Sequence, residues 1–79
     1  MTIRYAKNAV KAIGAMDSAY KRRIRQGIEG IPKGDIKPLQ GYPDGRQRLR
    51  IGKYRIVFRV ESENILHIMD IGSRGDIYK

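Results

Sequence analysis

The feature that most constrains the fold is a series of three strand-like segments in the second half of the chain. They are Gln47–Ile51, Tyr54–Glu61 and Ile65–Ile71, and each is rich in β-branched or aromatic residues. Short polar connections separate them, Gly52-Lys53 and Ser62-Glu63-Asn64, and connections of two or three residues are typical of β-hairpins. This half of the chain therefore predicts an antiparallel meander.

The first residues predict a short strand followed by a helix. Thr2–Tyr5 alternates polar with apolar residues, which favours a strand at the edge of a sheet. Beyond it, Val10 and Ile13 fall at helical spacing, with Ala9 and Met16 on either side of them. We expect these residues to form the thin buried stripe of a first helix.

A second helix has a clearer signal. Its apolar residues recur at intervals of four, four and three: Tyr20, Ile24, Ile28 and Ile31. Asp17 and Ser18 are of the types that cap helix N-termini, and Gly30 followed by Pro32 predicts an end near Gly30. Residues 33–45 contain three glycines and two prolines, which favours a surface connection over another regular element.

Together these segments predict an α+β protein with a single domain over residues 1–79. Two N-terminal helices are expected to pack on one face of a twisted antiparallel sheet, in the order β-α-α-β-β-β. The residues from Gly72 onward show no clear periodicity, and a short final strand there is an open alternative. A chain of 79 residues buries only a small core, and without cysteine this core must be held by packing alone.

The charge of the chain points to a polyanionic partner. The chain has 17 Lys and Arg residues but only eight Asp and Glu residues, which gives a net charge of +9. Nucleic acid is therefore the first expected partner. A membrane surface, an acidic protein partner or a role in solubility are the alternatives. One histidine and no cysteine predict no metal site, and the absence of a long apolar stretch predicts a cytoplasmic protein that does not engage a membrane.

The strongest candidate for chemistry is a row of basic residues. Arg46, Arg48 and Arg50 alternate with the core-type residues of the first predicted strand, and Arg55 and Arg59 share one face of the next. Between positions 46 and 59 there are six cations and no acid. Because like charges destabilise a sheet, the row indicates a phosphate ligand, for which arginine is suited; a solvated, edge-protecting face is the alternative.

Other polar residues carry less functional weight. The Lys21–Arg25 cluster is interpreted as an exposed helix face with a general attraction to nucleic-acid backbones. His67 alternates with apolar residues and is interpreted as a packing residue. Asp44 has the residue type of a turn, and Asp70 either orients an arginine or ends a strand.

Four motifs give the chain a resemblance to a known family. They are Leu39-Gln40-Gly41-Tyr42-Pro43-Asp44-Gly45, Arg48-Leu49-Arg50, Gly52-Lys53-Tyr54-Arg55-Ile56-Val57-Phe58 and Asp70-Ile71-Gly72-Ser73-Arg74-Gly75-Asp76-Ile77-Tyr78. In this combination the chain resembles the RelE/ParE toxin superfamily over nearly its whole length. The resemblance implies a RelE-like fold and the toxin of a type II toxin–antitoxin pair.

Within the RelE branch, the resemblance implies a metal-independent endoribonuclease without cofactors that cuts mRNA in the ribosomal A site. The ribose 2'-OH attacks the adjacent phosphorus, which requires a base, positive charge on the phosphorane and an acid. Arg55 and Arg74 match the phosphate-binding arginines of the family, Arg48 is an electrostatic stabiliser, and Tyr78 matches the tyrosine of proton transfer and base stacking. Further substrate contacts are expected from four cations: Arg46, Arg50, Lys53 and Arg59.

The resemblance also implies partners and alternatives. The expected partners are an acidic RelB-like antitoxin, mRNA and the 70S ribosome with its 16S rRNA, with operator DNA bound only through the antitoxin complex. One alternative is a ParE-like inhibitor of DNA gyrase. The other is a non-catalytic nucleic-acid-binding domain or a decayed toxin.

Overall fold

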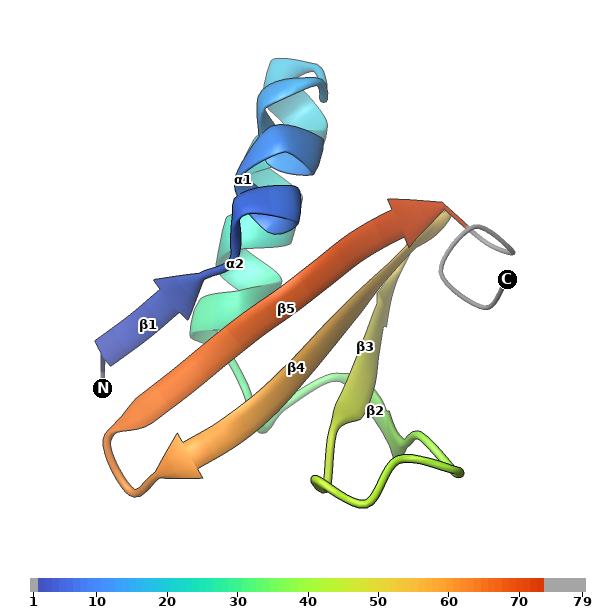
Figure 1. Ribbon diagram of the computed structural model, residues 1–79. Helices are drawn as coiled ribbons and strands as arrows, with labels where there is room; N and C mark the ends of the chain where they lie inside the picture. The colour runs from blue at the N-terminus through green and yellow to red at the C-terminus, as the bar shows by residue number, and fades with distance from the viewer. Residues whose placement is uncertain (1, 74–79) are drawn as a thin grey trace.

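The computed structural model describes residues 2–73 and has two helices and five strands (Figure 1). In chain order the elements are β1 (Thr2–Tyr5), α1 (Lys7–Gly14), α2 (Ser18–Glu29), β2 (Asp35–Pro38), β3 (Gln47–Ile51), β4 (Tyr54–Ser62) and β5 (Ile65–Ser73). The predicted α+β class is confirmed. Of the final strand left open after Gly72, only Ser73 lies within the described residues, and it extends β5.

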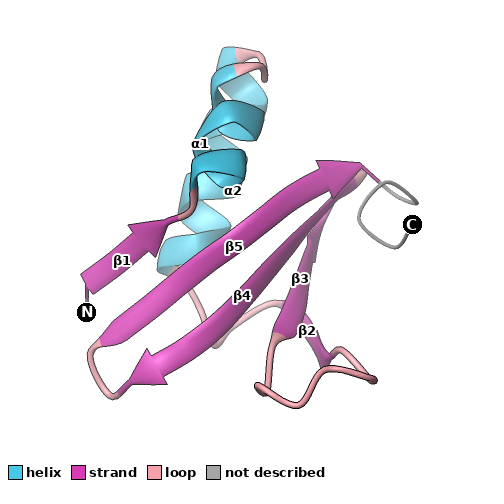
Figure 2. Ribbon diagram, in the orientation of Figure 1, coloured by secondary structure: helices cyan, strands magenta, loops and turns pink. Residues whose placement is uncertain are grey.

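The five strands form one sheet in the order β1-β5-β4-β3-β2 (Figure 2). The predicted meander of β3, β4 and β5 is confirmed, since β3 pairs antiparallel with β4 and β4 with β5. At one edge of the sheet β1 pairs with β5 in parallel, and the two helices connect β1 to β2 at the opposite edge.

The prediction that residues 33–45 hold no regular element was wrong, because β2 occupies Asp35–Pro38 and pairs antiparallel with β3. The physical reason lies in Ile36, whose Cα is opposite Leu49 and whose side chain packs against the core. Pro38 is compatible with this strand because an edge strand leaves one side of its backbone unpaired. The strand order along the chain is therefore β-α-α-β-β-β-β.

Helix α2 begins and ends where the sequence predicts. The Asp17 carboxylate accepts a hydrogen bond of 2.9 Å from the backbone N–H of Tyr20, which satisfies one of the free donors of the first turn. Ile24 and Ile28 are fully buried, and Gly30 forms the C-cap. The predicted N-cap, the burial of the two isoleucines and the end of this helix near Gly30 are thus confirmed.

In helix α1 the buried stripe differs from the prediction. Ala9 and Ile13 in the helix and Met16 just beyond its end are buried, whereas Val10 is 57% exposed. Residues 9 and 13 are four apart and lie on one helix face, and Val10 is turned about 100° away from Ala9. Placing Val10 in the buried stripe was therefore wrong.

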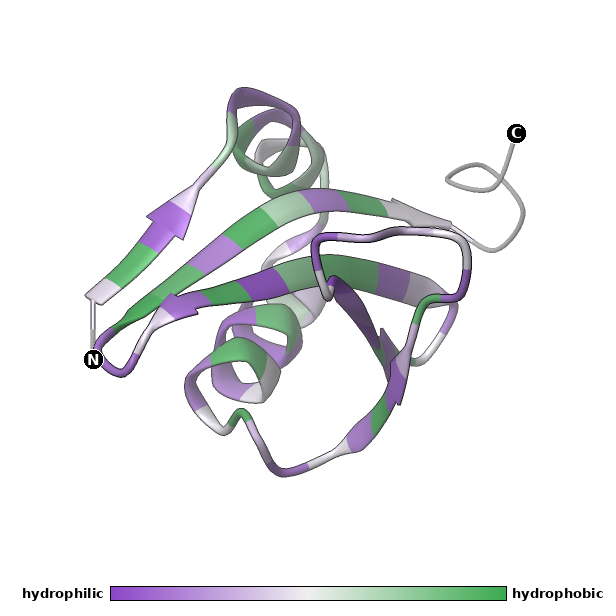
Figure 3. Ribbon diagram, turned by 60° about the horizontal axis from the view of Figure 1, so that its bottom comes forward, coloured by the Kyte–Doolittle hydropathy of each residue, from purple (hydrophilic) through white to green (hydrophobic). Residues whose placement is uncertain are grey.

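Both helices pack on one face of the sheet. Their buried residues form a single cluster with the strand residues that face the helices, which are Leu49, Ile56, Phe58, Leu66, Ile68 and Ile71. The strands carry alternating hydrophobic and hydrophilic bands, as expected for a sheet covered on one face (Figure 3). Neither α1 nor α2, the helices of the described residues, is long and apolar enough to cross a membrane.

Candidate phosphate-binding site

The strand register places the charged side chains on the face of the sheet that neither α1 nor α2 covers. One row of register partners belongs to the core: Leu49, Ile56 and Ile71. Because successive side chains point to opposite faces, the next row, Arg50, Arg55 and Gly72, faces away from the helices. The predicted alternation of basic and core residues along β3 is confirmed, and we call this side the open face.

Near the end of β4, five residues of the open face form an ion-pair chain. Arg46 donates to the Asp44 carboxylate at 2.7 Å, and Arg59 donates to the same carboxylate at 3.2 Å. Arg59 also lies 3.5 Å from Glu61, which pairs with Arg4 at 2.9 Å. The hydrogen bonds from Arg46 lower the pKa of Asp44 to about 2, and those same bonds raise the pKa of Arg46.

Arg48 is the most deeply placed cation of the row. It is only 8% exposed, and its guanidinium donates a 2.9 Å hydrogen bond to the backbone carbonyl of Asp35. The same nitrogen lies 3.4 Å from the Asp35 carboxylate. The acceptor is supplied by β2, the strand that the sequence did not predict.

These contacts divide the basic row. Arg46, Arg48 and Arg59 have carboxylate partners that all lie outside residues 46–59. Within the part of the chain that the structure describes, Arg50 and Lys53 form no ion pair. The unneutralised charge therefore gathers at the β3–β4 turn rather than along the whole row.

A pocket of about 230 Å³ opens at this turn and is lined by Arg50, Gly52, Lys53 and Arg55. We call it the turn pocket. Gly52 adopts a left-handed conformation with φ of 57°, which glycine accepts without strain and which lets the chain reverse within two residues. Three cations thus converge on a small cavity, the arrangement that favours an anion.

The end of β5 lies beside the turn pocket. The Cα of Arg55 is opposite Gly72, and Figure 1 shows β5 ending next to the β3–β4 turn. Arg74 and Tyr78, both expected in the site, lie outside the described residues. Arg74 is nevertheless the residue that directly follows Ser73 in the chain.

His67 lies far from the turn pocket. It is opposite Arg59 in the register, five residues along β5 from Gly72, which corresponds to about 16 Å of strand. Its Nδ1 is buried without a hydrogen-bond partner among the described residues and lies 3.9 Å from the Glu61 carboxylate. This position fits its interpretation as a packing residue.

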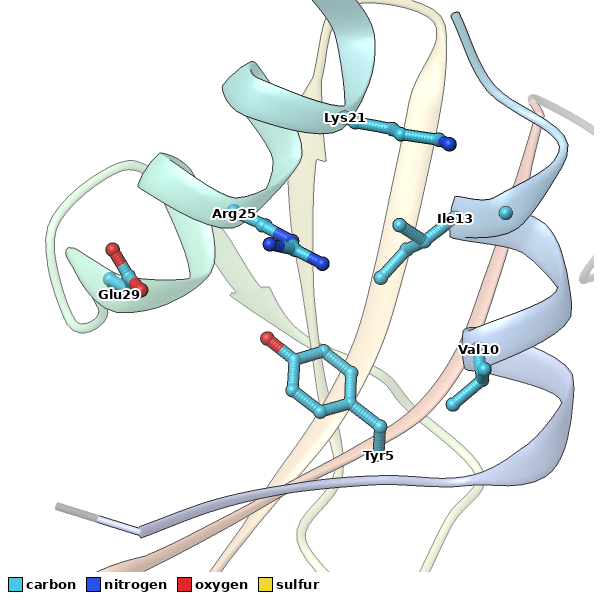
Figure 4. A pocket seen from close by; sticks show the side chains of 7 residues that line it. Tyr5, Val10, Ile13, Lys21, Arg25 and Glu29 are labelled. Carbon is cyan, nitrogen blue, oxygen red and sulfur yellow. The ribbon is translucent and has the colours of Figure 1, made fainter. Parts of the chain in front are cut away.

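A larger cleft of about 480 Å³ lies elsewhere, between β1, α1 and α2 (Figure 4). Val10 and Ile13 form an apolar wall opposite Lys21 and Arg25, and Tyr5 closes the base. Burial raises the pKa of the Tyr5 phenol. Of the described residues predicted to bind substrate, none lines this cleft.

Sequence reasoning missed the residues that neutralise or frame the basic row. Asp35 and Glu61 meet their arginines only through the sheet register, so no local pattern identifies them. Asp44 was interpreted as a turn residue, and its spacing of two from Arg46 was the one available signal. Tyr20 was assigned only to the apolar stripe of α2, although its ring lies beside Lys53.

The fold and the site define a small α+β protein with a basic open face and an arginine-lined pocket at one sheet end. The family profile described as "ParE toxin of type II toxin-antitoxin system, parDE" matches residues 3–78. The chain belongs to this family, within the RelE/ParE superfamily, and is the toxin of a type II toxin–antitoxin system. No curated protein matches the sequence.

Solved toxin structures share the fold. A chain in the RelB–RelE antitoxin–toxin complex from Methanococcus jannaschii is 28% identical with a TM-score of 0.75, covering 95% of this chain and 94% of that chain. A chain in the RelBE2 toxin–antitoxin complex of Mycobacterium tuberculosis is 22% identical with a TM-score of 0.75, covering 92% of this chain and 96% of that chain. A chain in the intact Escherichia coli RelBE complex is 20% identical with a TM-score of 0.57, covering 91% of this chain and 94% of that chain. The predicted RelE-like fold is confirmed.

Proposed function

We propose that this toxin is a ribosome-dependent endoribonuclease that cleaves mRNA in the A site. The observation that carries the proposal is the turn pocket, where Arg50, Lys53 and Arg55 converge beside the end of β5. The scissile phosphate would occupy this pocket, and the family resemblance adds Arg74 and Tyr78 to the proposed catalytic set.

The proposed reaction is attack of the ribose 2'-OH on the adjacent phosphorus, which leaves a 2',3'-cyclic phosphate and releases the 5'-hydroxyl of the next nucleotide. Arg55 and Arg50 stabilise the charge of the phosphorane, because guanidinium remains protonated and donates in a planar fork. The same property excludes arginine as a base. Tyr78 is the proposed proton-transfer group, because it matches the tyrosine to which the family resemblance assigns this role.

The test is to add the toxin to a translating extract and map the ends of the mRNA. Cuts in translated message, with 2',3'-cyclic phosphate ends, are expected. Arg55→Ala should slow cleavage by about 10²- to 10³-fold, the usual effect of removing one donor to a developing oxyanion. Lys7→Ala removes an exposed charge at the start of α1, outside the turn pocket, and is the matched control. Cleavage that is equally fast in both variants would reject the assignment.

We propose that an acidic antitoxin of the RelB kind neutralises the toxin, as in the complexes that contain the structural neighbours. The net charge of +9 favours such a partner, and the cleft of Figure 4 offers exposed Val10 next to Lys21 and Arg25. Co-expression with the product of the adjacent reading frame should restore growth. Val10→Asp, which adds repulsion to an acidic segment, should weaken this rescue if the cleft is used.

A second candidate is inhibition of DNA gyrase, which the ParE description of the matching family favours. The internal ion pairs of Arg46 and Arg48 also favour it, because these two side chains are already engaged within the protein. A supercoiling assay with purified gyrase separates the two functions. Inhibition that survives Arg55→Ala would favour the gyrase poison over the nuclease.

A further inference from the structure

Tyr20 of α2 lies in the middle of a small aromatic and cationic cluster at the β3–β4 turn. Its ring meets Tyr54 edge-on, with centroids 5.0 Å apart and planes at 75°. The Lys53 ammonium lies 5.6 Å from the Tyr20 centroid and 5.4 Å from that of Tyr54. The Arg23 guanidinium lies 5.0 Å from the Tyr20 centroid. Two cations from different elements thus share one tyrosine.

Gly52 brings these elements together. A Cβ at this position would lie 2.9 Å from the Tyr20 hydroxyl and 3.4 Å from the Arg23 guanidinium, so α2 lies directly against the turn. Arg23 is three residues from Tyr20 on the same helix, which places the two side chains on one face. The cluster formed by Arg23 and Lys53 therefore continues the turn pocket onto helix α2.

Placing cations this close has a cost that the tyrosines offset. Like charges repel, and Lys53 sits in an exposed two-residue turn, where its long side chain would otherwise sample many rotamers. The negative face of an aromatic ring attracts a cation within about 6 Å of its centroid, and both tyrosine rings meet this limit for Lys53. The rings hold the ammonium on the α2 side of the β3–β4 turn, next to the turn pocket that Lys53 lines. Unlike a carboxylate, they do not neutralise its charge.

We propose that Tyr20 is a positioning residue that holds Lys53 and Arg23 at the turn pocket, where both bind the phosphate backbone of single-stranded RNA next to the phosphate bound by Arg50 and Arg55. The inference rests on the proposed nuclease function and adds the helix α2 side of the RNA path. It changes the interpretation of Arg23 from a general surface charge to a ligand of the substrate.

The test measures binding of a fluorescent single-stranded RNA oligonucleotide whose 2'-hydroxyls are methylated, so that the 2'-OH attack cannot occur. Lys53→Ala and Arg23→Ala should each weaken binding about tenfold, as expected for losing a charged hydrogen bond. For Lys53→Ala the slope of log K against log salt should fall by about 0.7. Lys7→Ala should change the affinity less than twofold, a rough bound for a distant exposed charge.

The tyrosine itself is tested by a conservative pair of variants. Tyr20→Phe keeps the ring and should bind like the parent protein, whereas Tyr20→Leu should weaken binding about three- to fivefold. In a chain that carries both Lys53→Ala and Arg23→Ala, Tyr20→Leu should have no further effect, because a positioning residue acts only through the groups it positions. If Tyr20→Leu fails to fold by circular dichroism, Tyr54→Leu makes the same test for Lys53.

Two results would overturn the inference. One is parent-like binding by Tyr20→Leu, and the other is a loss of binding of the same size whether or not Lys53 and Arg23 are present. The fate of the proposed nuclease is read separately. Coupled losses of binding without mRNA cleavage in the extract would reject the nuclease and leave the positioning role standing, whereas cleavage without coupling would reject the positioning role alone.

Discussion

Arg48 provides the sharpest test of whether the basic row serves catalysis or packing. Its side chain is 10% exposed, and its guanidinium donates to the Asp35 carbonyl at 2.9 Å. An arginine that is this buried and engaged within the protein is expected to stabilise the fold through β2. We therefore compare Arg48→Ala with Arg48→Met, which removes the charge but keeps most of the apolar stem.

The magnitude follows from the packing. The two methylenes beyond Cβ that Arg48→Ala removes cost about 1.6 kcal/mol at about 0.8 kcal/mol each. The lost hydrogen bond of about 1.5 kcal/mol is largely offset, because the variant no longer buries a charged group. Arg48→Ala should lower the free energy of unfolding by about 2 kcal/mol, and Arg48→Met by less than about 1 kcal/mol. With an unfolding entropy of about 0.17 kcal/mol/K for 79 residues, 2 kcal/mol lowers Tm by about 12 °C.

Urea unfolding followed by circular dichroism measures both variants, with Arg50→Ala as the exposed control that should stay within about 0.5 kcal/mol of the parent. Equal losses for Arg48→Ala and Arg48→Met would refute the packing argument and assign the stability to the charge. A folded Arg48→Met that no longer cleaves mRNA would return Arg48 to the catalytic set.

Three further predictions concern stability. Gly52→Ala should lower the free energy of unfolding by at least about 1–2 kcal/mol in urea, because alanine disfavours φ of 57° and its Cβ would meet Tyr20; unchanged stability would contradict this. Asp44 has its pKa lowered from 3.8 to about 2, so its stabilising effect is fully present above about pH 4 and is lost as the pH falls through about 2. Asp44→Asn should therefore flatten the loss of stability between these pH values in acid titrations followed by circular dichroism, and an unchanged profile would argue against the ion pair. Ile24→Ala, in a fully buried position, should cost about 2–5 kcal/mol, whereas Val10→Ala should cost less than about 0.5 kcal/mol; similar costs would show that the helix faces are assigned wrongly.

The sequence alone determined the elements whose signals are local. The stripe from Tyr20 to Ile28 with its Asp17 cap predicted α2, and short polar connections between β-rich segments predicted β3, β4 and β5. Alternation along β3 also predicted that Leu49 faces the core and that its arginine neighbours face away. These features depend on helix and strand periodicity within a few residues, which a single sequence displays directly.

The structure decided what depends on residues far apart in the chain. The short strand β2 has one core residue, Ile36, between polar neighbours, and it becomes recognisable only when β3 offers a partner edge. Pairing of β2 with β3 places the Asp35 carbonyl where it accepts a hydrogen bond from Arg48, and the register of β4 places Arg59 beside Asp44.

The cations of the basic row therefore fall into two groups, those with a carboxylate partner and those without one among the described residues, and composition could not distinguish the two groups. Charges on one strand look equivalent in sequence, but Coulombic attraction acts over a few ångströms in space, so pairing with acids is set by the tertiary fold. Arg46 and Arg59 pair with Asp44 in the loop before β3, and Arg48 pairs with Asp35 of β2. Arg50 and Lys53 have no carboxylate partner among the described residues, and they line the turn pocket. The sequence supplied the positive charge, and the packing of α2 and β2 around the sheet determined where that charge remains available to a ligand.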